Sequence, residues 1–152
     1  MSWFRPTTNQ APAVSRGGVQ LREPWALPDS RVPGQAGGYL VIANTGAEAD
    51  RLVSAHCPLA ERTEIHGIKV MGADIKMRLL ADGVPIPPDY TTTLKPRGYH
   101  LLLRGLRTPL RSGGLLPVTL VFEKAGEVAV ELVAREPGLV GEAILNEEHY
   151  RV

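Results

Sequence analysis

The sequence predicts an all-β domain, an antiparallel sandwich or barrel, on two observations. Short apolar runs recur along the chain and are broken almost regularly by Pro and Gly, of which the 152 residues contain 13 and 16. Between the last two apolar runs, residues 124–127 read Lys-Ala-Gly-Glu, a loop of the length that joins hairpin strands. Several short strands at this spacing are typical of antiparallel sandwiches and barrels.

The candidate strands are short runs that Gly, Asn, Asp or Pro interrupts. Asn44-Thr45-Gly46 ends the first run, and Asp82-Gly83 turns the chain after the fourth. Pro85, Pro87 and Pro88 exclude a helix from the loop that follows. In chain order, the predicted strands are residues 39–42, 51–56, 61–66, 76–79, 91–94, 100–103, 118–122 and 128–133.

The length fits one domain with two terminal segments. Residues 1–17 contain Pro, Thr, Asn, Gln and Gly without a hydrophobic period, and we expect a flexible tail there. Residues 18–136 form the expected domain, which is large enough to bury a core without disulfides. Residues 137–152 form an extension whose pattern fits either a short helix or an extra strand.

Composition and motifs exclude several classes of function. The net charge is +1 and no Lys/Arg run is present, so neither nucleic acid nor an anionic membrane is an expected partner. No run approaches the roughly 18 apolar residues of a membrane span, and the first residues show no signal-peptide pattern. No Gly-x-Ser-x-Gly, His-Glu-x-x-His or phosphate-loop motif is present, so the sequence does not predict an enzyme.

A soft set of possible metal donors is the most informative feature. His66 is followed by Met71 and Met77, and His100 lies on a later apolar run. Imidazole and thioether together favour Cu(I) over hard ions such as Mg²⁺ or Ca²⁺. Cys57, the single cysteine, cannot form an internal disulfide, and its pairing with the adjacent His56 is best interpreted as structural because no second ligand pair would close a zinc site.

The order of the segments resembles the PCu(A)C family of periplasmic copper chaperones from about Val19 to Val133. The matching segments are Pro24-Trp25, residues 38–44, residues 50–53, Glu64-Ile65-His66, Ile86-Pro87-Pro88, residues 94–101, Gly105-Leu106, Pro109-Leu110 and Gly113-Gly114. The resemblance implies a cupredoxin-like antiparallel β-sandwich that binds Cu(I), a periplasmic location, a monomer and a copper-accepting partner protein.

The same resemblance implies the ligands. In that family a His, a Met, a second His and a final Met two residues later hold Cu(I). His66, Met77 and His100 match the first three, with ten and twenty-two intervening residues, the second spacing one longer than the family's. Leu102 stands at the fourth position, and Met71 or Cys57 is a possible substitute.

Two functions are compatible with Leu102 in place of the fourth ligand. Three donors can hold Cu(I), less tightly than four, so the first expectation is a Cu(I)-binding chaperone or carrier that delivers copper to a partner such as an oxidase assembly target. The second is a divergent member with weak or no copper binding that acts as a protein-interaction module. Leu102 favours the second, and so does Gly67, where many members have a Met after the first His.

Overall fold

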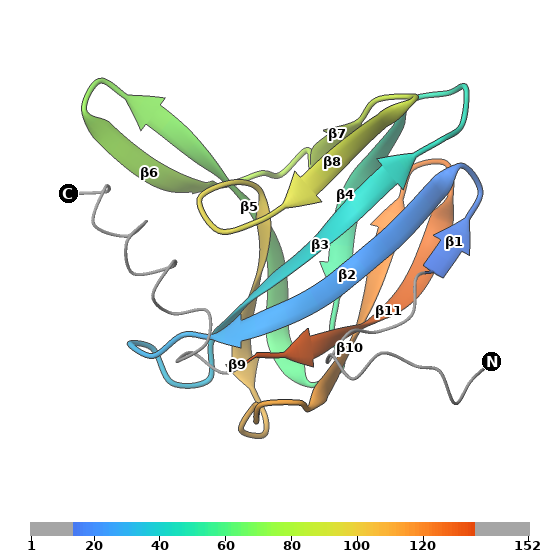
Figure 1. Ribbon diagram of the computed structural model, residues 1–152. Helices are drawn as coiled ribbons and strands as arrows, with labels where there is room; N and C mark the ends of the chain where they lie inside the picture. Colours follow the sequence, from blue (N-terminus) through green and yellow to red (C-terminus); the bar gives the residue numbers. More distant parts are fainter. Residues whose placement is uncertain (1–13, 136–152) are drawn as a thin grey trace.

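The computed structural model describes residues 14–135, apart from the side chains of residues 69–71, 74 and 75. Every regular element in this range is a strand, and none is a helix that could cross a membrane (Figure 1). The strands are β1 (Val14–Arg16), β2 (Val19–Pro28), β3 (Ala36–Asn44), β4 (Asp50–His56), β5 (Ala60–Met71), β6 (Asp74–Leu79), β7 (Val84–Ile86), β8 (Tyr90–Leu94), β9 (His100–Leu106), β10 (Leu115–Phe122) and β11 (Gly126–Ala134).

The predicted all-β fold is confirmed, with one exception to its antiparallel character. Hydrogen bonds join the strands in the order β6-β5-β9-β3-β2-β11-β10-β4-β7, with β1 added to β2 and β8 to β3. All pairs are antiparallel except β2 with β11, where Trp25 and Ala26 pair in parallel with Val133 and Ala134. The predicted antiparallel β-sandwich is thus confirmed, and this parallel pair is an exception within it, since no hairpin connects these two distant strands.

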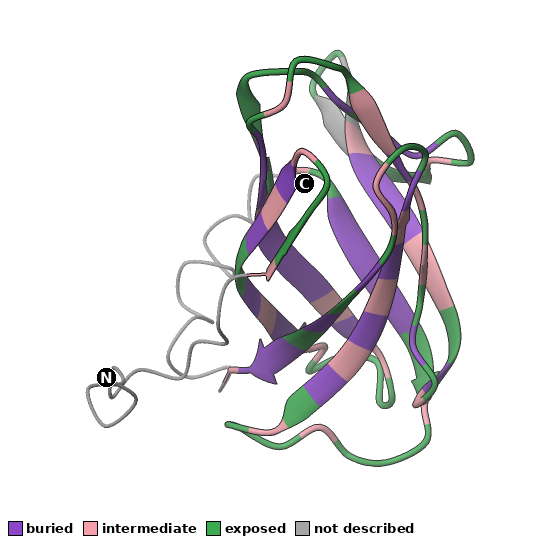
Figure 2. Ribbon diagram, turned by 90° about the vertical axis from the view of Figure 1, so that its right-hand side faces the viewer, coloured by how far each residue is buried: buried purple, intermediate pink, exposed green. Residues whose placement is uncertain are grey.

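The sheet curls around one hydrophobic core. Ile65 of β5 and Ile86 of β7 belong to the same buried cluster although their strands lie near opposite ends of the hydrogen-bonded order. Buried and less buried residues alternate along β10, from Leu116 to Phe122, as expected for a strand with one face on a core. Figure 2 shows the buried residues along the strands and the exposed residues mainly in the connecting loops.

The eight predicted strands all occur, and three further strands were not predicted. Val14–Arg16 (β1) pairs with β2, so this part of the expected tail 1–17 belongs to the sheet, whereas residues 1–13 and the expected extension 137–152 lie outside the described residues. Val19–Pro28 (β2) contains Pro24 and a register shift between Arg22 and Trp25. Val84–Ile86 (β7) accommodates Pro85 because it is an edge strand.

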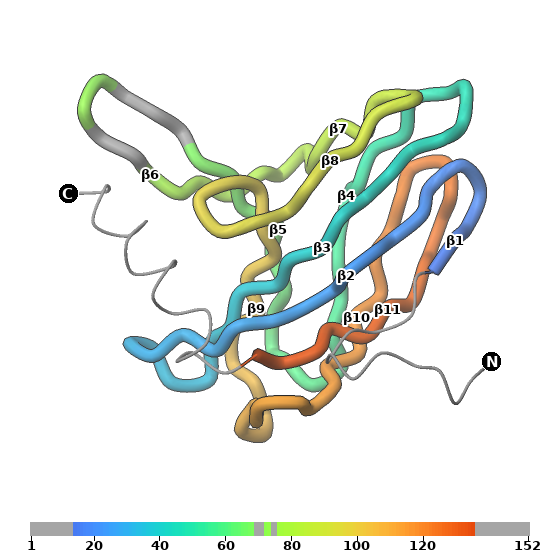
Figure 3. Tube along the Cα trace, in the orientation of Figure 1, coloured from blue at the N-terminus to red at the C-terminus, as the bar shows by residue number. Residues whose placement is uncertain are grey.

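Strand β5 has two different partners along its 12 residues. Its first part, up to His66, pairs with β9, whereas its second part, from His66 onward, pairs with β6. The β5–β6 hairpin therefore leaves the sandwich at His66 and forms the arm at the upper left of Figure 1, which Figure 3 shows as a trace. His66 lies at the junction between the sandwich and this arm.

Candidate metal centre

Two imidazoles lie directly opposite each other on neighbouring strands. His66 of β5 is the register partner of His100 of β9, so both side chains point to the same face of the sheet. Their ring centroids are 5.8 Å apart, with 28° between the ring planes. Only 8% of His66 and 6% of His100 is exposed, so the pair is largely shielded from solvent. The structure brings together two of the three predicted ligands.

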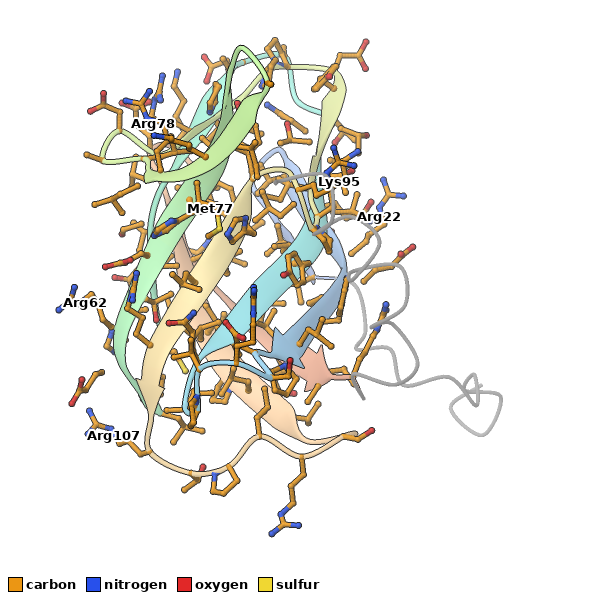
Figure 4. All side chains as sticks on the ribbon, turned by 90° about the vertical axis from the view of Figure 1, so that its left-hand side faces the viewer. Arg22, Arg62, Met77, Arg78, Lys95 and Arg107 are labelled. Atoms are coloured by element: carbon orange, nitrogen blue, oxygen red, sulfur yellow. The ribbon has the colours of Figure 1, made fainter. Side chains whose placement is uncertain are left out.

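Met77 lies on the same face, one step along the arm. In the β5–β6 register Leu79 is opposite His66 and Met77 is opposite Ile68, so Met77 is the diagonal neighbour of His66. Diagonal neighbours on one face are within reach of a long side chain. Met77 is 49% exposed, and Figure 4 shows it in front of the surface formed by β5 and β9. The thioether can approach the imidazoles from the solvent side.

Leu102 shares the face of His100. It lies two residues along β9, opposite Glu64 of β5 and Gly37 of β3, and it is 6% exposed. Its neighbour Leu101 points the other way, into the core cluster, to which Leu102 does not belong. A side chain at position 102 is therefore directed to the imidazole side of the sheet and not into the core.

Glu64 holds the His66 ring. His66 Nε2 donates a hydrogen bond of 2.8 Å to Glu64 Oε1, which also accepts one of 3.1 Å from Arg104 Nε. Arg62 Nη1 donates to Glu64 Oε2 at 3.2 Å. The bond from His66, together with the two guanidinium groups, lowers the pKa of Glu64 from 4.5 to about 2, against the opposing effect of burial. Glu64 is therefore an ionised carboxylate at neutral pH.

His100 is oriented by the backbone. Its Nδ1 donates a 2.9 Å hydrogen bond to the carbonyl oxygen of Gly98. Burial lowers the pKa of His100 below 6.5, and the nearby His66 lowers it further, whereas the bond to Gly98 opposes the shift. The His100 ring is therefore neutral at physiological pH, the form that can bind a metal ion.

Aromatic rings extend the face beyond the imidazoles. The Tyr39 ring centroid lies 6.2 Å from that of His100 and 4.5 Å from that of Trp25. The guanidinium carbon of Arg135 lies 4.3 Å from the centroid of the Trp25 ring. Tyr39 therefore lies beside His100, and its contact with Trp25 continues this cluster away from the imidazoles.

The other sulfur donors considered from the sequence are placed differently. Cys57 is 1% exposed within the core cluster, and burial raises the pKa of its thiol, so it is not available as a thiolate. His56, its neighbour, is exposed. Met71 lies at the end of β5 next to the hairpin turn, but its side chain is outside the described ones.

Gly67 does not lie on the imidazole face. A side chain at position 67 would point to the opposite side of β5. Leu80 fills the space there, since a Cβ at position 67 would lie 2.9 Å from Leu80 Cδ1. A Met at this position would therefore be directed away from His66 and His100. The glycine removes no donor from the His66–His100 face.

The donor set favours a soft ion. Among the side chains that the structure describes, no group of three or more His, Cys, Asp or Glu residues could hold a metal ion. Glu64 is already bonded to His66 and two arginines. What remains on this face is two imidazoles and one thioether, a combination that suits Cu(I) better than Zn²⁺ or a hard ion.

Sequence reasoning did not identify Glu64, Arg62 and Arg104 as parts of the site. Arg62, Glu64 and His66 alternate along β5 and share one face, which the sequence alone could have indicated. Arg104 comes from β9, and its proximity to Glu64 depends on the β5–β9 register. The sequence contains no local signal for that register.

The fold places this chain among domains of the PCuAC type. The apo PCuAC domain from PmoF1 superposes with a TM-score of 0.70 at 29% identity, covering 83% of this chain and 100% of that one. The copper-bound PCuAC domain from PmoF2 gives 0.69 at 24% identity, covering 84% and 100%. CuI-DR1885 from Deinococcus radiodurans gives 0.62 at 22% identity, covering 82% and 81%.

The chain belongs to the LpqE-like family, "Putative lipoprotein LpqE-like", whose model matches residues 19–134. It is also similar to "Putative lipoprotein Lxx21020" of Leifsonia xyli subsp. xyli, with 27% identity over 131 residues that cover 86% of this chain and 78% of that protein. The resemblance to PCu(A)C proteins that the sequence predicted is thereby confirmed.

Proposed function

We propose that this protein binds Cu(I) through His66, Met77 and His100 and passes it to a copper-accepting partner protein. The observation that supports this most directly is the shielded pair of opposed imidazoles, of which His66 Nδ1 is buried and has no hydrogen-bond partner. Two nitrogen donors and one thioether suit Cu(I), which accepts low coordination numbers. The copper-bound PCuAC domain of PmoF2 and CuI-DR1885 share the fold and support the same ion.

The exposure of the three residues fits a carrier. The imidazoles are shielded, whereas Met77 is half exposed on the arm. A partner's ligand can therefore approach from the Met77 side and replace the thioether first, while the two histidines still hold the ion. In this proposal the protein acts as a monomer outside the cytoplasm, in the periplasm, a location that the lipoprotein description of its family supports.

A second candidate function rests on Leu102. This residue lies on the imidazole face and supplies no lone pair, so in this second function copper affinity is too weak for transport. The protein would then act as an interaction module, with the exposed side chains of Met77 and Leu79 on the arm as contacts.

Competition for Cu(I) separates the two functions. The reduced protein is titrated against a chromophoric Cu(I) chelator, with His100→Ala as the test variant and His56→Ala as its control, because His56 is exposed and remote in register from the site. We expect the wild type and His56→Ala to compete equally. The affinity of His100→Ala should fall by more than about 100-fold, since loss of even an outer-shell partner costs 10–100-fold.

Two results would contradict the copper-carrier function. Failure of the wild type to take Cu(I) from the chelator would favour the interaction module. Equal losses in His100→Ala and His56→Ala would mean that Cu(I) binds elsewhere in the protein.

A further inference from the structure

The two nitrogens of the His66 ring have different surroundings. Nε2 lies 2.8 Å from Glu64 Oε1, and an ionised carboxylate can only accept a hydrogen bond, so the ring proton is on Nε2. In a neutral His66 ring the lone pair is therefore on Nδ1. That atom is buried and has no partner in the structure. A buried, unpartnered lone pair costs free energy unless something binds to it.

The carboxylate is itself fixed by two arginines, one from each strand. Arg62 lies on β5 and Arg104 lies opposite it on β9, and together they donate to both oxygens of Glu64, at 3.2 Å and 3.1 Å. The Glu64 side chain is 13% exposed. The two arginines therefore fix the position of the carboxylate, and its Oε1 atom stays directed at His66 Nε2.

In His100 the two ring nitrogens have the opposite roles. Its Nδ1 donates to the Gly98 carbonyl, which can only accept, so its lone pair is on Nε2. The turn that carries Gly98 is closed by hydrogen bonds from Gly98 N to Lys95 O and from Lys95 N to Tyr99 O, each of 2.9 Å. The backbone thus fixes this ring, as the carboxylate fixes the other.

We propose that the copper site uses Nδ1 of His66 and Nε2 of His100, and that Glu64, held by Arg62 and Arg104, is the positioning residue that imposes this tautomer on His66. The inference rests on the proposed function and specifies its ligand atoms. A carboxylate that accepts the other ring proton orients a ligating histidine and makes it a better donor. The hydrogen bonds from the two arginines keep the carboxylate directed at Nε2.

Glu64→Gln tests the role of the charge with little change of shape. The amide oxygen can still accept from Nε2, but the amide N–H₂ can instead donate to it, so both tautomers of His66 become accessible. Glu61→Gln is the matched control, because Glu61 lies on the same strand, is exposed and faces the other side of it.

Nitrogen NMR of the metal-free protein reads the tautomer directly. Long-range proton–nitrogen spectra of ¹⁵N-labelled protein distinguish protonated from unprotonated ring nitrogens. We expect His66 in the wild type and in Glu61→Gln to be protonated on Nε2 alone, and His66 in Glu64→Gln to be a mixture. A wild-type His66 protonated on Nδ1, or a tautomer unchanged in Glu64→Gln, would overturn the inference.

Addition of Cu(I) to the same samples tests the ligand atoms. The signals of His66 Nδ1 and His100 Nε2 should shift most, and Glu64→Gln should bind Cu(I) about 10–100-fold more weakly. Glu64→Asp, which keeps the charge, should recover part of that loss. Cu(I) uptake without a shift of His66 Nδ1 would overturn this inference alone. No uptake by a wild type with the stated tautomers would overturn the proposed function and the ligand assignment with it.

Discussion

Leu102 stands where the resemblance to PCu(A)C proteins implies the fourth copper ligand, a Met. Its position in the structure makes the effect of this replacement testable. It lies on the imidazole face, outside the core cluster and two residues from His100. Leu and Met have similar volumes, so the exchange changes the donor set more than the packing.

Leu102→Met should therefore tighten Cu(I) binding and leave the fold almost unchanged. We expect a stability cost under about 1.5 kcal/mol in urea unfolding and a gain of about tenfold in Cu(I) affinity by chelator competition, about 1.4 kcal/mol. The gain should be much smaller for Zn²⁺, because a thioether prefers the softer ion. Leu101→Met is the control, since it adds a sulfur on the same strand but inside the core. An equal gain in both variants, or none in Leu102→Met, would contradict the ligand position assigned to residue 102.

Glu64 predicts how stability responds to acid. Its pKa is lowered from 4.5 to about 2 in the folded protein, so the unfolded chain binds its proton at higher pH. The stability due to Glu64 is complete above pH 4.5 and is lost as the pH falls toward 2. The urea midpoint of the wild type should therefore fall more steeply across this window than that of Glu64→Gln. Glu61→Gln should follow the wild type, and identical slopes for the wild type and Glu64→Gln would show that Glu64 has an ordinary pKa.

At the scale of elements, part of the site follows from strand periodicity and part does not. Because side chains alternate along a strand, the sequence predicted that His100 and residue 102 share a face. The pairing of β5 with β9 joins residues about 40 positions apart, so the contact of Glu64 with Arg104 could not be predicted from local patterns. The prolines excluded a helix near Pro85 but did not indicate the short edge strand β7 there.

The parallel pairing of β2 with β11 had no local signal for the same reason. It joins Trp25 to Val133, more than a hundred residues apart in the chain. Only the hairpins, such as the one around residues 124–127 that joins β10 to β11, could be read from turn residues and spacing.

The turn between β6 and β7 packs closely against β4 and should be sensitive to a single methyl group. Gly83 has φ +79°, and a Cβ at this position would overlap the carbonyl oxygen of Leu52 on β4. Gly113 has a similar φ of +83° with nothing within 4 Å of a Cβ, so it is the matched control. In urea unfolding we expect Gly113→Ala to cost about 1 kcal/mol from backbone conformation alone and Gly83→Ala to cost about 3 kcal/mol or more. Equal costs would mean that β4 moves away freely from this turn.

At the scale of the whole molecule, the fold separates stability from binding. The core is enclosed by the inner faces of a sheet that curls around it, whereas the candidate site lies on an outer face, where the arm leaves the sandwich at His66. Changes on the outer face can therefore alter the donor set without opening the core. This arrangement explains how Leu102 can replace the Met that the family resemblance implies at this position while the PCuAC-type fold is retained.

Copper K-edge X-ray absorption of the Cu(I)-loaded protein tests the proposed site most directly, because it counts nitrogen and sulfur neighbours of the ion. We predict two nitrogen scatterers and one sulfur scatterer in the wild type. The sulfur should disappear in Met77→Leu and persist in Met71→Leu. A spectrum without sulfur, or a sulfur that survives in Met77→Leu, would contradict the binding of Cu(I) by His66, Met77 and His100.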